Sequence, residues 1–158
     1  DVTLDPDTAH PRLVLSPDLR SVRWEYGLGE PPGHHPRRFV SEPCVLGRPA
    51  FSSGRHSWVV DVAAGQFCAV GVSRESLGGG GGPLRFEPEA GVWGLQQWGF
   101  RNRALTRPPT PLELPRAPRR IRVCLDYEWG EVAFRDGDSR ALIFAFPPAS
   151  FAGERVRP

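Results

Sequence analysis

The chain has 158 residues, of which 39% are hydrophobic and 24% charged, and a net charge of +2. These values are typical of one globular domain that buries a core without disulfides or metal, and they exclude a disordered tail. The small net charge does not by itself predict nucleic-acid binding, and no apolar run approaches the roughly 20 residues of a membrane helix.

The predicted elements are short strands, because 18 glycines and 18 prolines interrupt the sequence too often for long helices. Only the opening favours a brief helical turn, where Asp5 can cap the first amides and Pro6 suits the first helical position. Short strands bounded by Pro, Gly or Ser are expected around Arg12–Leu15, Ser21–Trp24, Cys44–Leu46, Phe51–Ser53 and Val92–Leu95.

The middle of the chain predicts two longer strands. Trp58 and Val60 share one face of the first strand while Val59 and Asp61 take the other, which is the period of two of a half-buried strand. The following run, Phe67–Val72, is apolar nearly throughout. Such a run favours a central strand that is covered on both faces.

The late part of the chain predicts an antiparallel meander of three strands. Apolar residues alternate from Ile121 to Tyr127, a turn follows at Glu128–Gly130, and the chain returns as a second strand. Asp136-Gly137 supplies residues that tolerate positive φ in a tight hairpin, and apolar residues alternate again from Leu142 to Phe146.

Many short strands at regular intervals predict an all-β fold, a β-sandwich of two antiparallel sheets. The irregular stretches between the strands are Glu25–Arg38, Ser76–Ala90 and Gly99–Pro118. We expect these stretches to be loops, and loops on a rigid sheet scaffold are where binding residues usually lie.

No motif predicts catalysis. Asp126 and Glu128 are two carboxylates at i and i+2, but this spacing supplies no substrate cleft, and we expect both to accept hydrogen bonds from backbone or arginine at the hairpin. The five glycines at 78–82 lack the Gly-Lys and Ser or Thr of a phosphate-binding loop, which favours a flexible connector. His56, at a strand start, is expected to be structural.

The cysteines indicate a reducing compartment. Cys44, Cys68 and Cys124 form an odd and widely spaced set, whereas small secreted domains use even, dense sets. No pair has the C-x-x-C spacing of a zinc or redox site, so neither a metal nor a cofactor is expected. The opening residues also lack the basic and then apolar layout of a signal peptide. We therefore expect a cytoplasmic domain without membrane contact.

Three signatures in order resemble the LDP, WEVE and LDYE motifs of the PRY-SPRY domain. They are Leu4-Asp5-Pro6, Trp58-Val59-Val60-Asp61 and Leu125-Asp126-Tyr127-Glu128. The sequence between these motifs also looks like that family, so the resemblance covers essentially the whole chain. It implies two packed antiparallel sheets in a concanavalin-like jelly roll, with a PRY segment at residues 1–47 and a SPRY segment at 48–158.

The chain departs from the family pattern at three places. Val59 stands where the family usually has glutamate, and Phe67-Cys68 replaces an expected tryptophan, so we expect adjusted core packing at both positions. Similar domains continue past the position of Pro158 into a loop and a final strand. The chain is therefore expected to lack the last C-terminal strand of the family.

The resemblance implies a module without catalysis that recognises a partner or substrate protein. Its form looks like the C-terminal targeting domain of a tripartite-motif ubiquitin ligase, whose ligase activity would reside in an upstream RING domain. A butyrophilin-type intracellular signalling domain is the alternative.

The main candidate for partner binding is the region around Trp98, where a predicted strand gives way to a loop rich in aromatic and arginine side chains. Such side chains are enriched at interface hot spots, and in family members this strand and loop line the binding face. The alternative is that Trp98 completes the core. The candidate residues are Trp98, Phe100, Arg101 and Arg103, with Arg23, Arg74 and Glu75 as weaker ones placed by resemblance beside variable loops.

An RNA-binding surface is a less favoured alternative. It would use Trp98 and Phe100 as stacking platforms. The arginines available for it are Arg101, Arg103, Arg107, Arg116, Arg119, Arg120 and Arg122. Several of these arginines are expected on opposite strand faces, which argues against one continuous basic surface.

Overall fold

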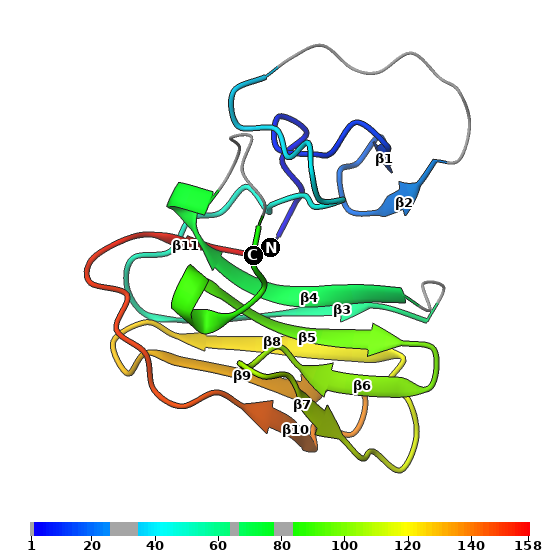
Figure 1. Cartoon of the computed structure of the whole chain (residues 1–158), viewed down its shortest axis with the longest axis vertical. Helices are drawn as coiled ribbons and strands as arrows, with labels where there is room; N and C mark the ends of the chain where they lie inside the picture. Colours follow the sequence, from blue (N-terminus) through cyan, green and yellow to red (C-terminus); the bar gives the residue numbers. More distant parts are fainter. Residues whose placement is uncertain (1, 26–34, 64–66, 78–83) are drawn as a thin grey trace.

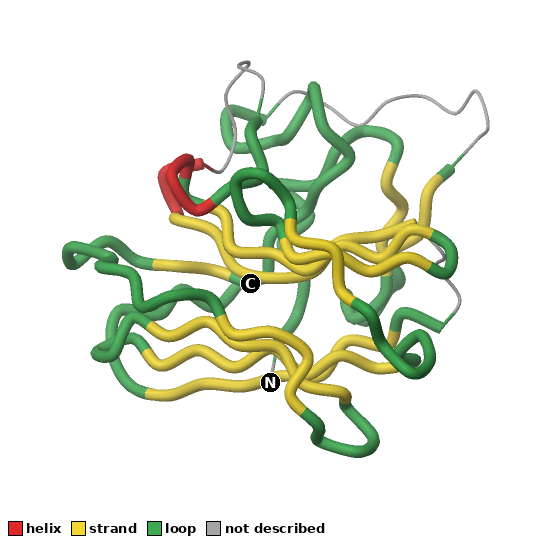
Figure 2. The backbone as a smooth tube through the Cα atoms, turned by 60° about the horizontal axis from the view of Figure 1, so that its bottom comes forward, coloured by secondary structure: helices red, strands yellow, loops and turns green. Residues whose placement is uncertain are grey.

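The computed structural model describes residues 2–25, 35–63, 67–77 and 84–158. Within these ranges a four-stranded and a five-stranded antiparallel sheet pack as two layers, and a separate two-stranded ribbon lies beside them (Figures 1 and 2). The predicted all-β sandwich is confirmed. The expected glycine connector at 78–82 and residues 26–34 of the first expected loop lie outside the described residues.

The five-stranded sheet has the strand order β11-β4-β5-β6-β7. Its strands are β4 (Phe67–Arg74), β5 (Val92–Trp98), β6 (Arg101–Ala104), β7 (Thr110–Leu112) and β11 (Val156–Arg157). Two 3-10 helices, η1 (Glu75–Leu77) and η2 (Pro88–Ala90), lie between β4 and β5 in the chain. The loop expected at Gly99–Pro118 thus contains two strands. The alternation of apolar residues did not predict β6, because its two buried inward positions are the polar Asn102 and the small Ala104.

The four-stranded sheet has the order β10-β9-β8-β3 and confirms the predicted meander. Its strands are β3 (Arg55–Asp61), β8 (Arg120–Asp126), β9 (Glu131–Asp136) and β10 (Leu142–Ala145). In the β9–β10 turn the positive φ falls on Arg140, at 67°, and not on Asp136-Gly137 as expected. The Asp136 carboxylate instead accepts hydrogen bonds from the amides of Asp138 and Ser139, which lowers its pKa.

The hydrophobic core lies between the two sheets. Val123 on β8 and Phe134 on β9 are fully buried, and they face Leu95 and Trp93 on β5 in one contiguous cluster. The Trp93 ring meets Phe151 edge-on at 5.2 Å between centroids. Trp58 packs half-buried against the same cluster, so the tryptophans expected in the core, Trp58 and Trp93, are there.

The N-terminal segment forms little regular structure. The ribbon consists of β1 (Leu13–Leu15) and β2 (Val22–Trp24). The strands expected at Cys44–Leu46 and Phe51–Ser53 are absent from the described structure, which has two isolated bridges there, Leu4 to Gly47 and Phe51 to Val156. Prolines in this stretch lack a backbone donor and limit longer pairing.

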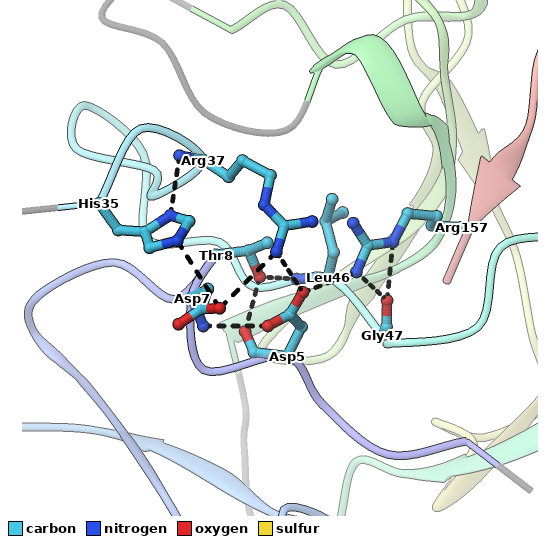
Figure 3. Close-up of polar contacts among 8 residues, drawn as sticks. All are labelled: Asp5, Asp7, Thr8, His35, Arg37, Leu46, Gly47 and Arg157. Atoms are coloured by element: carbon cyan, nitrogen blue, oxygen red, sulfur yellow. Dashed lines mark hydrogen bonds and ion pairs between the residues drawn. The ribbon is translucent and has the colours of Figure 1, made fainter.

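A buried polar cluster joins this segment to the sandwich (Figure 3). The Arg157 guanidinium donates to an Asp5 carboxylate oxygen at 3.0 Å and to the Gly47 carbonyl at 2.7 and 2.9 Å. The other Asp5 oxygen accepts the amide of Asp7, which is the short capped turn expected at the opening. We call Asp5, Gly47 and Arg157 the N-terminal clasp.

Candidate partner-binding face

The β5–β6 hairpin carries the main predicted binding residues. Trp98 and Arg101 pair directly across it, and Gly99-Phe100 form the turn between them. Gly99 has φ 59°, a conformation that glycine adopts without steric cost in tight hairpins. Phe100, at the tip, exposes 98% of its surface. The hairpin thus brings Trp98, Phe100 and Arg101 together at one end of the five-stranded sheet.

Trp98 lies on the outer face of this sheet, with 58% of its surface exposed. Its cross-strand partners are Phe67 on β4 and Arg101 on β6, and paired positions point to the same face. Phe67 is 69% exposed. Phe67, Trp98 and Arg101 therefore lie in one row across β4, β5 and β6. The alternative that Trp98 completes the core is wrong.

The neighbouring row on the same face holds Gln96 and Arg103, which are also cross-strand partners. The Arg103 Nε donates to the Gln96 side-chain oxygen at 2.5 Å, so the guanidinium is held in one direction. We call the resulting surface the aromatic–arginine face; it consists of Phe67, Gln96, Trp98, Phe100, Arg101 and Arg103.

Phe67 and Gln96 are the members of this face that the sequence did not predict, and Phe67 has the larger exposed side chain of the two. The prediction that both faces of Phe67–Val72 are covered is wrong, because β4 alternates and only its inner face is packed. The outer positions hold the small residues Ala69 and Gly71, so the run reads as uniformly apolar. The expectation of adjusted core packing is wrong at Val59 and Phe67, whose side chains are exposed, whereas Cys68 is partly buried and packs against the core. The sequence feature that could have drawn attention to Phe67 is the departure from the family pattern at 67–68, where a tryptophan is expected.

Arg74 and Glu75 lie at the other end of β4, about 23 Å along the strand from Phe67. The Arg74 guanidinium donates to the carbonyls of Phe151 and Ser150 and lies 5.6 Å from the Trp93 ring centroid. The Glu75 carboxylate accepts a 2.7 Å hydrogen bond from Arg155. Both side chains therefore hold the C-terminal segment against the sandwich.

Arg23 lies on the ribbon strand β2, where it forms an exposed ion pair with Glu25 at 3.1 Å. It is not part of the aromatic–arginine face, and neither are Arg74 and Glu75. A partner-binding role for these three residues stays a prediction.

The carboxylates of Asp126 and Glu128 have a structural role at the hairpin. Asp126 accepts hydrogen bonds from Arg55 at 2.9 Å and from the Trp129 amide at 3.2 Å. Glu128 accepts the Gly54 amide with both oxygens, at 2.9 and 3.0 Å. The expectation of backbone and arginine donors at this hairpin is confirmed. His56 is structural as well, since its ring contacts the Ser53 carbonyl at 2.7 Å and stacks on Phe51.

The three cysteines are free thiols, as predicted. Burial, with a contribution from Glu42, raises the pKa of Cys44 to about 12. Burial also raises the pKa values of Cys68 and Cys124. Protonated thiols at neutral pH are poor nucleophiles and poor metal ligands.

In the described ranges, no three His, Cys, Asp or Glu side chains gather closely enough to hold a metal ion. No helix in those ranges is long and apolar enough to cross a membrane.

Two packed antiparallel sheets of four and five strands define this protein as a β-sandwich. Comparison with known families agrees, because the SPRY-associated domain, PRY, matches residues 2–51 and the SPRY domain matches residues 55–158. The chain therefore belongs to the PRY-SPRY family, and SPRY domains are protein-interaction modules. The division between the two segments at Gly47 stays a prediction.

Curated relatives cover nearly the whole chain. Bovine (Bos taurus) butyrophilin subfamily 1 member A1 is 47% identical over 97% of this chain and 29% of that protein. Human (Homo sapiens) E3 ubiquitin-protein ligase TRIM38 is 44% identical over 99% of this chain and 33% of that protein. Human zinc finger protein RFP is 43% identical over 100% of this chain and 30% of that protein. The chain thus spans about a third of the length of these relatives.

Solved structures show the same fold at lower identity. The TRIM65 PSpry domain superposes with a TM-score of 0.81 at 24% identity, covering 99% of this chain and 82% of that one. Stonustoxin gives a TM-score of 0.81 at 20% identity, covering 99% of this chain and 25% of that one.

Proposed function

We propose that this domain recognises a protein or peptide partner through the aromatic–arginine face and carries no catalytic chemistry of its own. The observation that supports this most strongly is the cross-strand row of Phe67, Trp98 and Arg101 on an outer sheet face. Aromatic and arginine side chains dominate interface hot spots, because they combine large contact area with directed hydrogen bonds.

The geometry favours a partner segment with an apolar side chain and a neighbouring carboxylate. Phe67 and Trp98 are 69% and 58% exposed, so an apolar group placed on them would remove both rings from water. Arg101 and Arg103 follow on the next strand, with Arg103 directed by Gln96. A guanidinium binds a carboxylate through two parallel hydrogen bonds, which would set the direction of the partner chain.

We further propose that the domain serves as the substrate-targeting part of a tripartite-motif ubiquitin ligase, with a butyrophilin-type intracellular signalling domain as the alternative. Ligase activity would reside in a RING domain upstream of this chain. The identities to human TRIM38 and to butyrophilins support both parents at similar strength. A cytoplasmic location fits the free thiols of the chain.

The distribution of arginines weighs against RNA as the ligand. Arg101 and Arg103 lie on the five-stranded sheet, whereas Arg120 and Arg122 lie on β8 in the other sheet. A strand of RNA would need one continuous basic surface beside its stacking platforms.

A photo-crosslinking experiment tests the proposed face. The photoreactive residue p-benzoylphenylalanine is placed at position 100, whose native side chain is 98% exposed, and the domain is irradiated in cell lysate. We expect crosslinked proteins that disappear when Phe67 and Trp98 are both changed to alanine. The same crosslinker at position 86, where the native Phe86 is 36% exposed and precedes the opposite end of β5, is the matched control. An identical set of crosslinked proteins from positions 100 and 86, unaffected by the double alanine variant, would refute the face.

A further inference from the structure

The outer face of the four-stranded sheet has a second, different surface. Four small residues pair in one row across all its strands: Ser57 on β3, Cys124 on β8, Ala133 on β9 and Ala145 on β10. On the same face it is flanked by Arg122 and Arg135 on one side and by Asp126 and Glu131 on the other, and we call these three rows the trough. An adjoining hollow of about 600 Å³ is lined by Ser57, Cys124, Asp126, Trp129 and Glu131 among others.

One bank of this trough carries two arginines directly opposite each other. Arg122 on β8 pairs in register with Arg135 on β9. Like charges placed opposite each other on neighbouring strands destabilise a sheet. Among the described residues, neither guanidinium has a carboxylate within ion-pair distance; Arg122 donates to the Ser57 hydroxyl at 3.2 Å and Arg135 to the Arg140 carbonyl at 3.0 Å.

Other arginines of the same face are neutralised within the domain. Arg120 contacts Asp138 at 2.9 Å and Asp61 at 3.7 Å. Arg55 contacts Asp126 at 2.9 Å on the opposite bank of the trough. The pair formed by Arg122 and Arg135 therefore stands out as two aligned cations that lack a counter-charge from the described residues around them.

We propose that the trough binds an extended acidic segment of a partner protein, whose carboxylates pair with Arg122 and Arg135. Ser57 and Ala145 are small and exposed, so a main chain can approach the sheet closely there, and the exposed side chains of Val59 and Leu142 close the two ends of the arginine row. Each guanidinium offers a planar fork that matches a carboxylate. This surface is separate from the aromatic–arginine face and does not depend on the function proposed for that face.

The charge pattern selects this occupant over two others. A second copy of the chain is a poor fit, because its net charge is +2. A polyphosphate backbone is also a poor fit, because Asp126 and Glu131 line the opposite bank and would repel it. A peptide can direct its carboxylates toward Arg122 and Arg135 alone and keep them away from Asp126 and Glu131.

The test uses the 158-residue chain and a fluorescent ten-residue peptide of alternating glutamate and valine, with binding followed by fluorescence anisotropy in about 100 mM salt. We expect the double variant Arg122→Gln with Arg135→Gln to bind at least about tenfold more weakly, since it loses charged hydrogen bonds. The matched control, Arg20→Gln with Arg48→Gln, removes the same charge from two exposed positions of the N-terminal segment and should bind within about twofold of the unchanged chain. Thermal melts establish that both variants are folded.

Any one of the following outcomes would overturn the proposal. One is equal binding by the two double variants, and another is no binding by the unchanged chain. Equal binding of a peptide in which glutamine replaces every glutamate would also contradict it, as would tighter binding of an oligouridylate of ten nucleotides with the steep salt dependence of nucleic-acid contacts. A loss shown by Arg101→Gln with Arg103→Gln, but not by Arg122→Gln with Arg135→Gln, would place the acidic ligand on the aromatic–arginine face instead.

Discussion

Arg157 donates a 3.0 Å hydrogen bond to the carboxylate of Asp5, although 152 positions separate the two residues in the chain (Figure 3). Their side chains are only 4% and 11% exposed. The Gly47 carbonyl accepts the two other hydrogen bonds of the same guanidinium. The clasp thus fastens the N-terminal segment to β11 at a point where both charges are largely shielded from bulk water.

Changing Asp5 to asparagine should lower the free energy of unfolding by about 3 kcal/mol, because it leaves the buried Arg157 charge without its partner. Urea unfolding followed by tryptophan fluorescence measures the difference. Asp7→Asn is the control. Asp7 is half-exposed, and its contacts with Arg37 and His35 are both 3.7 Å, so about 0.5 kcal/mol or less is expected. Equal losses for the two variants would contradict a special role for the clasp.

The clasp should also make stability depend on pH in a defined direction. Burial raises the pKa of Asp5, but the hydrogen bonds from Arg157 and the Asp7 amide outweigh it and hold the pKa below the ordinary 3.8. A depressed folded-state pKa stabilises the fold above the unfolded-state value and loses that contribution as the pH falls through the folded-state value. The difference in unfolding free energy between the unchanged chain and Asp5→Asn should be constant from pH 5 to 7 and shrink below about pH 4. A difference that grows on acidification would have the wrong sign.

Two glycines with positive φ should respond differently to alanine. Gly99 has φ 59° and open space around the position of a Cβ, so Gly99→Ala should cost about 1 to 2 kcal/mol from backbone strain alone. Gly130 has φ 67°, and a Cβ there would lie 1.6 Å from the Ala149 carbonyl oxygen. Gly130→Ala should therefore cost about 4 kcal/mol or more, because the backbone at 149 must move. Thermal and urea unfolding of both variants compare them; similar costs would mean that the close approach is absent in solution.

Phe134 and Phe67 should respond differently to alanine, because the first lies in the core and the second on the proposed binding surface. Phe134 is fully buried between the sheets, so Phe134→Ala should cost about 3 to 5 kcal/mol. Phe67 is 69% exposed on the outer face, and Phe67→Ala should change stability by about 0.5 kcal/mol or less. Calorimetric melting of the two variants measures this contrast. A large loss of stability for Phe67→Ala would indicate that the side chain is packed and unavailable to a partner.

Local sequence patterns were sufficient for much of the scaffold. Alternation in β3, β8 and β9 reports which side chains face the core, because the inner positions of these strands are mostly apolar and the outer ones mostly polar. The same logic failed for β6, where the buried Asn102 interrupts the apolar period. It also failed for β4, where Ala69 and Gly71 on the open face resemble core residues.

The composition of the proposed binding face was predicted in part. The composition of the hairpin pointed to Trp98, Phe100, Arg101 and Arg103, and the tertiary structure places all four at one end of one sheet. Phe67 could not be assigned to them from its sequence position, 31 residues before Trp98, since only the β4–β5 register makes the two rings neighbours. The role of Asp5 was likewise limited to a local cap until Arg157 was placed beside it.

The sequence alone determined the fold class, the meander at the end of the chain and the family. Alternation, turn residues and short motifs are local properties, and they can be recognised without knowing the tertiary contacts. Only the tertiary structure decided which residues share a surface. The row of Phe67, Trp98 and Arg101 and the opposed Arg122 and Arg135 depend on strand register, and the clasp between Asp5 and Arg157 depends on a long-range side-chain contact. A shift of one residue in any of these strand pairs would turn the same side chains to the other face.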